Sequence, residues 1–205
     1  MSSRSSPDRE QLLCLAREGS SYALGQLLET YRSYLLLLAR LQIGRRLQGK
    51  VDPADVVQEA FLRAHRDFAR FRGTTEEEWA GWLRQILAAR LGDVVRRYCG
   101  TRRRDVRLER ELEGELDQSS RILDQGLVAK LSSPSHQAAR REQAVLLAEA
   151  LEKLPEDYRE VLILHHLEEC NFPEVARRMG RSIEGVKKLW ARALGRLRRS
   201  LGGMS

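Results

Sequence analysis

Apolar residues recur at helical spacing along almost the whole chain, and this pattern constrains the fold more than any other feature of the sequence. The apolar positions follow steps of three and four residues in three long stretches, 24–38, 57–71 and 79–98. No segment alternates apolar and polar residues between the turn dipeptides that a β-hairpin needs. Helix starts are marked by a capping residue followed by Pro or Glu, as at Asp52-Pro53 and Thr75-Glu76. The sequence therefore predicts an all-α fold.

The helical pattern weakens at one place in the chain. Residues 117–135 mix Ser, Gly and Pro with isolated apolar residues, which is typical of a flexible linker with at most one short helix. Regular helical spacing resumes near His136 and continues as four predicted helices, 136–153, 155–168, 171–179 and 182–199. We therefore predict two helical domains, 1–116 and 136–205, joined by a linker over 117–135.

Composition and length exclude several classes of protein. The chain has 205 residues, of which 42% are hydrophobic and 32% are charged, as in globular proteins. No apolar stretch approaches the roughly 20 residues of a membrane span. The polar N-terminus lacks the apolar core of a signal peptide. We expect a cytoplasmic protein that does not insert into a membrane.

Cysteine and histidine give little sign of a special site. Cys14, Cys99 and Cys170 are far apart and form no C-x-x-C pair, so we expect no disulfide framework. His165, His166 and Cys170 lack a fourth ligand at a zinc-like spacing. We interpret them as solvated histidines at a helix end and a small buried thiol, and we expect no metal and no cofactor. The P-loop, G-x-S-x-G and H-E-x-x-H motifs are absent, so an enzyme is not expected.

Positive charge is concentrated near the C-terminus. From Asn171 onward the sequence has nine basic and two acidic residues, a net of +7 that equals the formal charge of the whole chain. A second basic block, Arg84 to Arg110, holds nine arginines against three acidic residues. Such segregation favours contact with a polyanion at two places. For either block alone, a simply solvated Arg-rich helix face explains the sequence equally well.

The segment 172–199 has the pattern of a DNA-binding helix-turn-helix. A short helix from Phe172 to Met179 is followed by Gly180, which can take the left-handed conformation, and by Ser182, a good N-cap. We expect the second helix to bury Ile183, Val186, Trp190 and either Ala193 or Leu194. Its early polar residues would face bases in the major groove, and its arginines would meet phosphates. The predicted DNA-contacting residues are Arg181, Ser182, Glu184, Gly185, Lys187, Lys188, Arg192 and Arg196.

Motifs in both domains resemble those of one protein family. The segment 52–64, DPADVVQEAFLRA, resembles the D-x-x-D-L-V-Q-E-x-F-L-R-A signature of region 2 in the extracytoplasmic function group of bacterial sigma-70 factors. Phe68 to Gly73, with Trp82-Leu83, Ile86, Asp93 and Arg96-Arg97 after it, is similar to the next part of that region. Residues 151–161 resemble the start of region 4, and residues 174–193 resemble its helix-turn-helix. Ala89 departs from the pattern, because the family commonly has Asn there.

The resemblance implies a role for named residues of the first domain. Region 2 of the family docks on the clamp of RNA polymerase through a helix that here carries Asp55, Gln58, Glu59 and Arg63. Region 2 also opens the promoter at the minus-10 element by holding a flipped base in a loop, here 71–76. The implied minus-10 and melting residues are Phe71, Arg72, Thr74, Thr75, Arg90, Arg96 and Arg97, while Trp79 and Trp82 are expected in the core.

Two functional hypotheses follow. The first is a sigma factor that binds core RNA polymerase and promoter DNA, recognises the minus-10 and minus-35 elements and helps melt the DNA. In this family an anti-sigma factor often covers the polymerase-binding faces, so such a partner is a further expectation. The second hypothesis is a dimeric helix-turn-helix regulator that binds an operator and never joins the polymerase.

Overall fold

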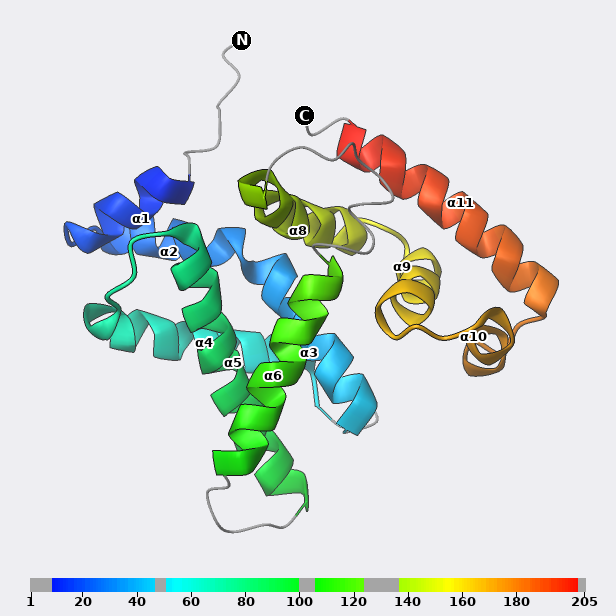
Figure 1. The fold of residues 1–205 in the computed structure, drawn as a ribbon, viewed down its shortest axis with the longest axis horizontal. Helices are drawn as coiled ribbons and strands as arrows, with labels where there is room; N and C mark the ends of the chain where they lie inside the picture. The colour runs from blue at the N-terminus through cyan, green and yellow to red at the C-terminus, as the bar shows by residue number, and fades with distance from the viewer. Residues whose placement is uncertain (1–8, 47–50, 100–105, 124–136, 203–205) are drawn as a thin grey trace. The chain divides into compact units, whose positions relative to one another are not determined.

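The computed structural model describes residues 9–46, 51–99, 106–123 and 137–202. All regular secondary structure in these ranges is helical, which confirms the predicted all-α class. The chain divides into two compact units, Met1–Asp117 and Gln118–Ser205 (Figure 1).

The first unit is a bundle built around α3 (Arg32–Arg46), α4 (Pro53–Asp67) and α5 (Glu76–Cys99), which pack on one another. The hairpin of α1 (Arg9–Arg17) and α2 (Ser21–Thr30) packs at one end, and the short 3₁₀ helix η1 (Phe68–Arg70) continues α4. Leucines and aromatic residues fill the core, and Trp79 is its largest fully buried side chain. Burial of this apolar surface is the main favourable term in the stability of the bundle.

The start of α4 follows the sequence signal. Asp52 adopts an extended backbone conformation, and its side chain accepts a hydrogen bond from the backbone N–H of Ala54 at 2.8 Å. Pro53 stands in the first turn, where its missing N–H costs nothing. Val57, Ala60, Phe61 and Ala64 then form the buried stripe that the helical spacing predicts.

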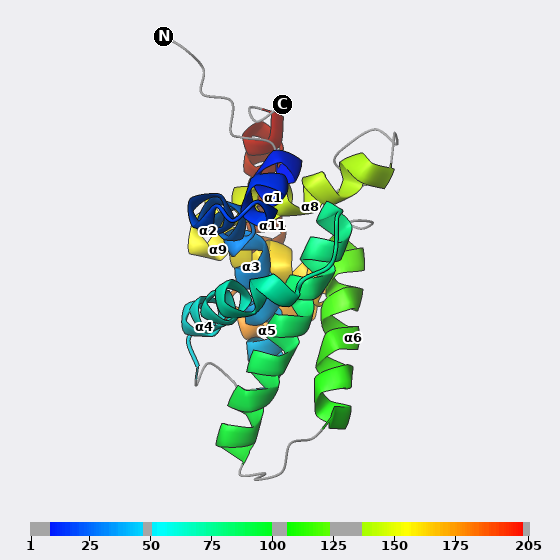
Figure 2. The ribbon, with the colours of Figure 1, turned by 90° about the vertical axis from the view of Figure 1, so that its left-hand side faces the viewer.

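Helix α6 (Val106–Ile122) runs alongside α5 (Figures 1 and 2). Leu112 and Leu116 are fully buried, and Arg84 Nε donates to Asp117 Oδ1 at 2.6 Å. Residues 117–122, predicted as the beginning of the linker, therefore continue α6 instead. Leu112, Leu116, Ser119 and Leu123 follow steps of three and four and are all buried, so the buried stripe of α6 extends into this segment. The rest of the predicted linker, apart from Leu123, lies outside the described residues.

The second unit contains α8 (Gln137–Glu152), α9 (Glu156–Leu162), the π-helical turn η3 (Ile163–Leu167), α10 (Phe172–Arg178) and α11 (Ile183–Gly202). The long helix α11 packs on α8, α9 and α10 (Figure 1). Val175, Val186, Ala193 and Leu197 are fully buried between these helices. In neither unit do the described helices include one long and apolar enough to cross a membrane.

Candidate polymerase and nucleic-acid interface

One face of α4 is exposed and carries most of the residues predicted to bind polymerase. Asp55, Gln58 and Glu59 are exposed on it. Arg63 lies at its edge, where its Nε is 3.4 Å from Asp67 Oδ2. Leu62 belongs to the same face and is 57% exposed. Leu62 was not among the residues predicted to bind polymerase, although its position outside the buried stripe of α4 was a usable signal.

A ladder of ion pairs joins α4, α5 and α6 and uses two of the arginines predicted to contact DNA. Arg90 pairs with Glu59 of α4 and, at 2.9 Å, with Asp93. Arg96 pairs with Asp93 and, at 3.2 Å, with Glu109 of α6. Both side chains are largely buried in these pairs. In the described structure Arg90 and Arg96 thus join helices through ion pairs, and their predicted contact with DNA stays a prediction.

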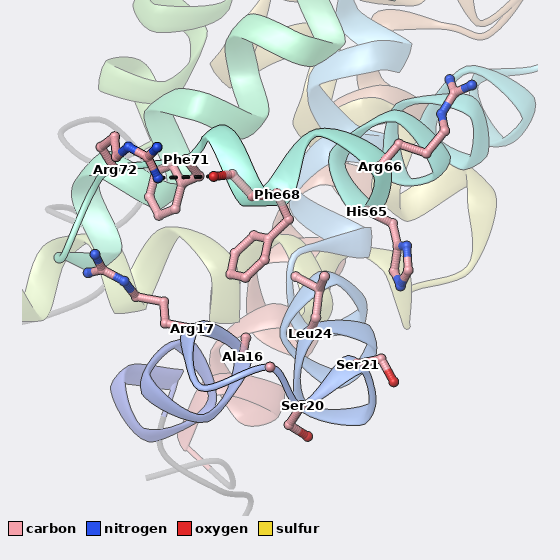
Figure 3. Close-up of a pocket in the computed structure, with 12 residues that line it drawn as sticks. Ala16, Arg17, Ser20, Ser21, Leu24, His65, Arg66, Phe68, Phe71 and Arg72 are labelled. Carbon is pink, nitrogen blue, oxygen red and sulfur yellow. Dashed lines mark hydrogen bonds between the residues drawn. The ribbon is translucent and has the colours of Figure 1, made fainter.

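Phe71, predicted to contact the minus-10 element, lies with Phe68 in an aromatic cluster of the first unit that borders a pocket (Figure 3). Its side chain is only 9% exposed and packs against Trp79 and Trp82, with ring centroids 5.4 Å and 5.0 Å apart. Phe68 extends this aromatic cluster, with its ring centroid 5.8 Å from that of Trp79. The ring of Phe71 thus belongs to the aromatic core that Trp79 and Trp82 of α5 form, and its predicted contact with a base stays a prediction.

The loop 72–75 is shaped by Glu78, a residue that the sequence analysis missed. Glu78 Oε2 accepts hydrogen bonds from the backbone N–H groups of Thr74 at 2.7 Å and Thr75 at 3.1 Å. In return, Thr75 Oγ1 accepts a hydrogen bond from the backbone N–H of Glu78 at 3.2 Å. This reciprocal pair is a capping box, and T-x-x-E is its sequence signal. The bonds from Thr74 and Thr75 lower the pKa of Glu78.

Two more contacts hold the same loop. Arg17 of α1 donates from Nη1 to the carbonyl oxygen of Gly73 at 3.0 Å. A Cβ on Gly73 would lie 2.4 Å from the ring of Phe71 and 2.7 Å from Cβ of Glu78, so only glycine fits. Thr74, Thr75 and Arg72 are exposed, and Arg97 is exposed near the end of α5.

The predicted helix-turn-helix is present in the second unit. Gly180 has a φ of +62°, the left-handed conformation that its position requires. The backbone N–H of Arg181 donates to the carbonyl of Ala176 at 2.9 Å, and Ser182 Oγ caps α11 by accepting from the backbone N–H of Gly185 at 3.1 Å. The turn between α10 and α11 is thus closed by its own backbone and by Ser182.

Most of the residues predicted to contact DNA lie on the open surface of α11. Glu184, Lys187, Lys188, Arg192 and Arg196 are exposed, and Gly185 is half-buried. Lys188 Nζ is 3.6 Å from Glu184 Oε2. Arg181 pairs with Asp157 of α9.

Ile183, at the start of α11, was predicted to be buried and is instead 44% exposed. It precedes the buried stripe of α11 that begins at Val186. The prediction was wrong because the first turn of a helix extends beyond the helices that cover its later turns.

A cluster of aromatic and imidazole rings packs α11 against η3, the turn before α10. Trp190 Nε1 donates to His166 Nε2 at 3.0 Å, and the ring of His165 stacks on Phe172 with centroids 4.3 Å apart. His165 Nδ1 is also 2.9 Å from the carbonyl oxygen of Cys170. The interpretation of these histidines as solvated is therefore wrong. Among the described residues, no group of three or more His, Cys, Asp or Glu side chains is placed to hold a metal ion.

Comparison with known proteins agrees with the order of these elements. The family model for sigma-70 region 2 matches residues 30–100, and that for sigma-70 region 4 matches residues 144–197. The chain is 28% identical over 144 residues to the ECF RNA polymerase sigma factor SigM of Bacillus subtilis, covering 70% of this chain and 76% of that one.

Two further relatives match over more of the chain. Identity to the ECF RNA polymerase sigma factor SigW of Bacillus subtilis is 24% over 188 residues, covering 90% of this chain and 92% of the relative. Identity to the ECF RNA polymerase sigma factor SigM of Mycobacterium tuberculosis is 27% over 192 residues, covering 94% and 84%. With both regions in order, the chain belongs to the sigma-70 family, as an RNA polymerase sigma factor of the extracytoplasmic function group.

Proposed function

We propose that this sigma factor docks on core RNA polymerase through the exposed face of α4, opens promoters with the loop 72–75 and reads the minus-35 element with α11. Leu62 is the observation that supports docking at α4. It is an exposed apolar side chain beside the polar residues Asp55, Gln58 and Glu59. Partner interfaces combine an apolar anchor with a polar rim in this way.

The docking test compares two exposed leucines of the first unit. Leu62→Ala is expected to raise the Kd for core polymerase about tenfold, because truncation of an interface anchor costs more than about 1 kcal/mol. Leu15→Ala on α1, also exposed, serves as the matched control and is expected to bind like the wild type. Equal affinities of the two variants in a competition assay would refute docking at this face.

Glu59 is a poor site for a charge-reversal test, because it also pairs with Arg90 of α5. Asp55 is exposed and can be changed without breaking an ion pair of the described structure. Asp55→Asn is therefore expected to weaken polymerase binding while the circular dichroism spectrum stays helical. Glu113→Gln on α6 is the control for removal of one negative charge.

The loop 72–75 is proposed to take the unpaired minus-10 strand. Arg72, Thr74 and Thr75 are its exposed polar side chains, and Thr75 also caps α5 by accepting from the backbone N–H of Glu78. The test therefore leaves Thr75 in place and changes Arg72 and Thr74. Replacing both by Ala is expected to leave polymerase binding intact and to reduce permanganate-reactive thymines in the promoter. Unchanged melting would place base capture elsewhere.

The open surface of α11 is proposed to read bases through its first turns and to hold phosphates through its later arginines. Lys188→Ala is expected to cost about 1 to 3 kcal/mol at the preferred site and to change the ranking of single-base variants. Arg198→Ala is expected to weaken all sites alike and to make the salt dependence shallower by about one unit of slope. The affinity of holoenzyme for labelled promoters is the measurement. If both variants weaken binding to all promoter sequences by the same factor, Lys188 does not contact bases.

RNA polymerase and chromosomal DNA share the bacterial cytoplasm, and we propose the same compartment for this factor. The anti-sigma partner implied by the resemblance stays a prediction.

A further inference from the structure

The segment between α9 and α10 departs from regular helical geometry at two places. Ile163–Leu167 form the π-helical turn η3, and Glu169 has a φ of +55°. Among the described residues, Glu169 is the only one other than glycine with a positive φ. Such features cost free energy, persist only where surrounding contacts hold them, and are frequent at functional sites. The side chains of His165 and His166, within η3, make contacts of this kind.

His165 joins the irregular turn to α10. Its Nδ1 is 2.9 Å from the carbonyl oxygen of Cys170, and its ring stacks on Phe172 with centroids 4.3 Å apart. A carbonyl oxygen only accepts hydrogen bonds, so Nδ1 is the donor here. The backbone N–H of Cys170 donates to the carbonyl of Leu164 at 3.0 Å and closes the same turn. The start of α10 is therefore held by the imidazole ring of His165.

His166 contacts α11 instead. Trp190 Nε1 donates to His166 Nε2 at 3.0 Å, and the two rings are inclined by 30° with centroids 6.1 Å apart. An indole N–H can only donate, so His166 Nε2 is the unprotonated nitrogen that accepts. Both side chains are half-buried, and an indole N–H that lost its acceptor there would be unfavourable. This hydrogen bond therefore fixes the ring of Trp190 against η3.

The ring of Trp190 is connected to a residue that is proposed to read bases. Lys187 stands three residues before Trp190, which is one turn back on the same side of α11. Lys187 Nζ lies 6.0 Å from the centroid of the Phe172 ring, within the range of a cation–π contact. The Phe172 ring meets Trp190 edge to face, with centroids 5.6 Å apart. A change at Trp190 is therefore transmitted to the first turns of α11.

Rotation of α11 about its own axis decides whether its side chains reach base edges. Side-chain ends lie about 5 to 6 Å from a helix axis, so a rotation of about 10° displaces them by about 1 Å. Binding sites require side chains within about 0.5 Å of their productive positions. The attraction between a cation and a phosphate about 5 Å apart changes by only about a fifth over the same displacement. A contact that fixes the rotation therefore affects base reading more than phosphate binding.

We propose that His166 is a positioning residue for base reading, because it accepts the hydrogen bond of Trp190 and thereby sets the rotation of α11 at the minus-35 element. The inference rests on the proposal that α11 reads this element through its first turns. It assigns a role to a residue that lies outside the helix-turn-helix itself. It also gives the irregular turn a purpose, since η3 carries His165 to α10 and His166 to α11.

The test measures the affinity of holoenzyme for two labelled promoters, one selected by the wild-type holoenzyme and the same promoter with its minus-35 element scrambled. His166→Leu removes the acceptor and is expected to lower the ratio of the two affinities about tenfold, the discrimination of roughly one good base contact. Its affinity for the scrambled promoter is expected to stay within about twofold of the wild type, since phosphate contacts tolerate the displacement. His166→Gln offers an amide oxygen as acceptor and is expected to restore most of the ratio.

Trp190→Phe removes the donor and keeps an aromatic ring. It is expected to lower the promoter ratio about as much as His166→Leu, and the double variant is expected to be no worse than either, because both changes remove the same bond. Arg159→Gln is the matched control within the second unit. Arg159 Nη1 donates to Glu152 Oε1 at 3.2 Å and joins α9 to α8, so this variant is expected to lower the melting temperature without changing the promoter ratio.

The indole N–H signals of the full chain give a spectroscopic readout. The three tryptophans give three indole signals in a ¹H–¹⁵N spectrum, and Trp190→Phe identifies the signal of Trp190. His166→Leu is expected to speed solvent exchange of the Trp190 indole hydrogen, and His166→Gln is expected to slow it again. The signal of Trp79, whose Nε1 is buried without a hydrogen-bond partner in the described structure, is expected to stay unchanged.

The proposal is overturned if His166→Leu keeps the wild-type promoter ratio, if it weakens both promoters equally, if His166→Gln restores nothing, or if the losses of the two single variants add in the double variant. Lys188→Ala separates this failure from failure of the proposed function. A changed ranking of base variants in Lys188→Ala, with an unchanged ratio in His166→Leu, refutes the role of His166 alone. Equal weakening of all promoters by Lys188→Ala refutes the proposed base reading itself.

Discussion

At the scale of single residues, burial decides which of two similar side chains is available to a partner. Phe71 and Phe68 stand three positions apart, yet Phe71 is enclosed by Trp79 and Trp82 while Phe68 is only half-buried. Ile183 and Val186 of α11 differ in the same way: Val186 is fully buried, whereas Ile183 is 44% exposed. Apolar side chains that the fold leaves open are the ones that deserve a functional test.

Ile183 gives a prediction at this scale. An exposed apolar side chain at the start of a recognition helix can contact the C5-methyl group of thymine in the major groove. Ile183→Ser is therefore expected to abolish discrimination between thymine and uracil at one position of the upstream element. Loss of one such contact costs about 0.8 kcal/mol, which is roughly fourfold in affinity.

Holoenzyme binding to promoters with single thymine-to-uracil replacements is the measurement for Ile183. The wild type is expected to lose affinity at one replaced position, and Ile183→Ser at none. A variant that still distinguishes the two bases would show that Ile183 does not face the DNA. Because Ile183 is exposed, the substitution leaves the core of the second unit unchanged.

At the scale of elements, hydrogen bonds from side chains to backbone shape the functional segments. Glu78 organises the loop before α5, and Ser182 caps α11 after the turn at Gly180. The ladder from Glu59 through Arg90 to Glu109 fixes α4, α5 and α6 at their polar edges. The two capping interactions have a short sequence signal, whereas the ion pairs join residues of different helices.

The capping box at α5 predicts a pH dependence. The pKa of Glu78 is lowered below its ordinary value by the bonds from Thr74 and Thr75, so folding favours the ionised carboxylate. The stabilisation by Glu78 is thus present above the ordinary pKa and is lost as the pH falls through the lowered one. Glu78→Gln is expected to reduce the melting temperature at neutral pH.

The difference in melting temperature between the wild type and Glu78→Gln is expected to shrink as the pH falls below the ordinary carboxyl range. Thermal melts followed by circular dichroism between neutral and acidic pH measure it. Glu113→Gln on α6, which removes one negative charge elsewhere in the same unit, is the control. A pH-independent difference would mean that the Glu78 charge does not hold the loop.

At the scale of the whole molecule, the chain consists of two compact units, each with its own apolar core. A two-unit chain need not unfold in one step. The division also separates the proposed tasks, with docking and minus-10 capture in the first unit and minus-35 reading in the second.

Independent cores predict independent unfolding. Val175 is fully buried in the second unit, and Val175→Ala removes two methyl-sized groups, at a cost of about 2 kcal/mol. For a domain of this size that corresponds to a fall of about 10 °C in the melting temperature of the second unit. Calorimetry is expected to show one transition shifted and the other unchanged.

Leu38→Ala in the core of the first unit is the reciprocal variant, and it is expected to shift only the other transition. A single transition that moves in both variants would contradict independence of the units.

The sequence by itself determined the helical class, the capping residues and the helix-turn-helix, because each depends on residues within one or two turns of one another. The helical period, the Asp52-Pro53 start, the turn at Gly180 and the family motifs are all local signals of this kind. Only the tertiary structure decided the burial of Phe71, the ion pairs of Arg90 and Arg96 with other helices, and the exposure of Ile183. Phe71 is covered by α5, Arg90 pairs with Glu59 of α4, and Arg96 pairs with Glu109 of α6. A periodic pattern along one segment carries no information about which side chains of another helix will meet it.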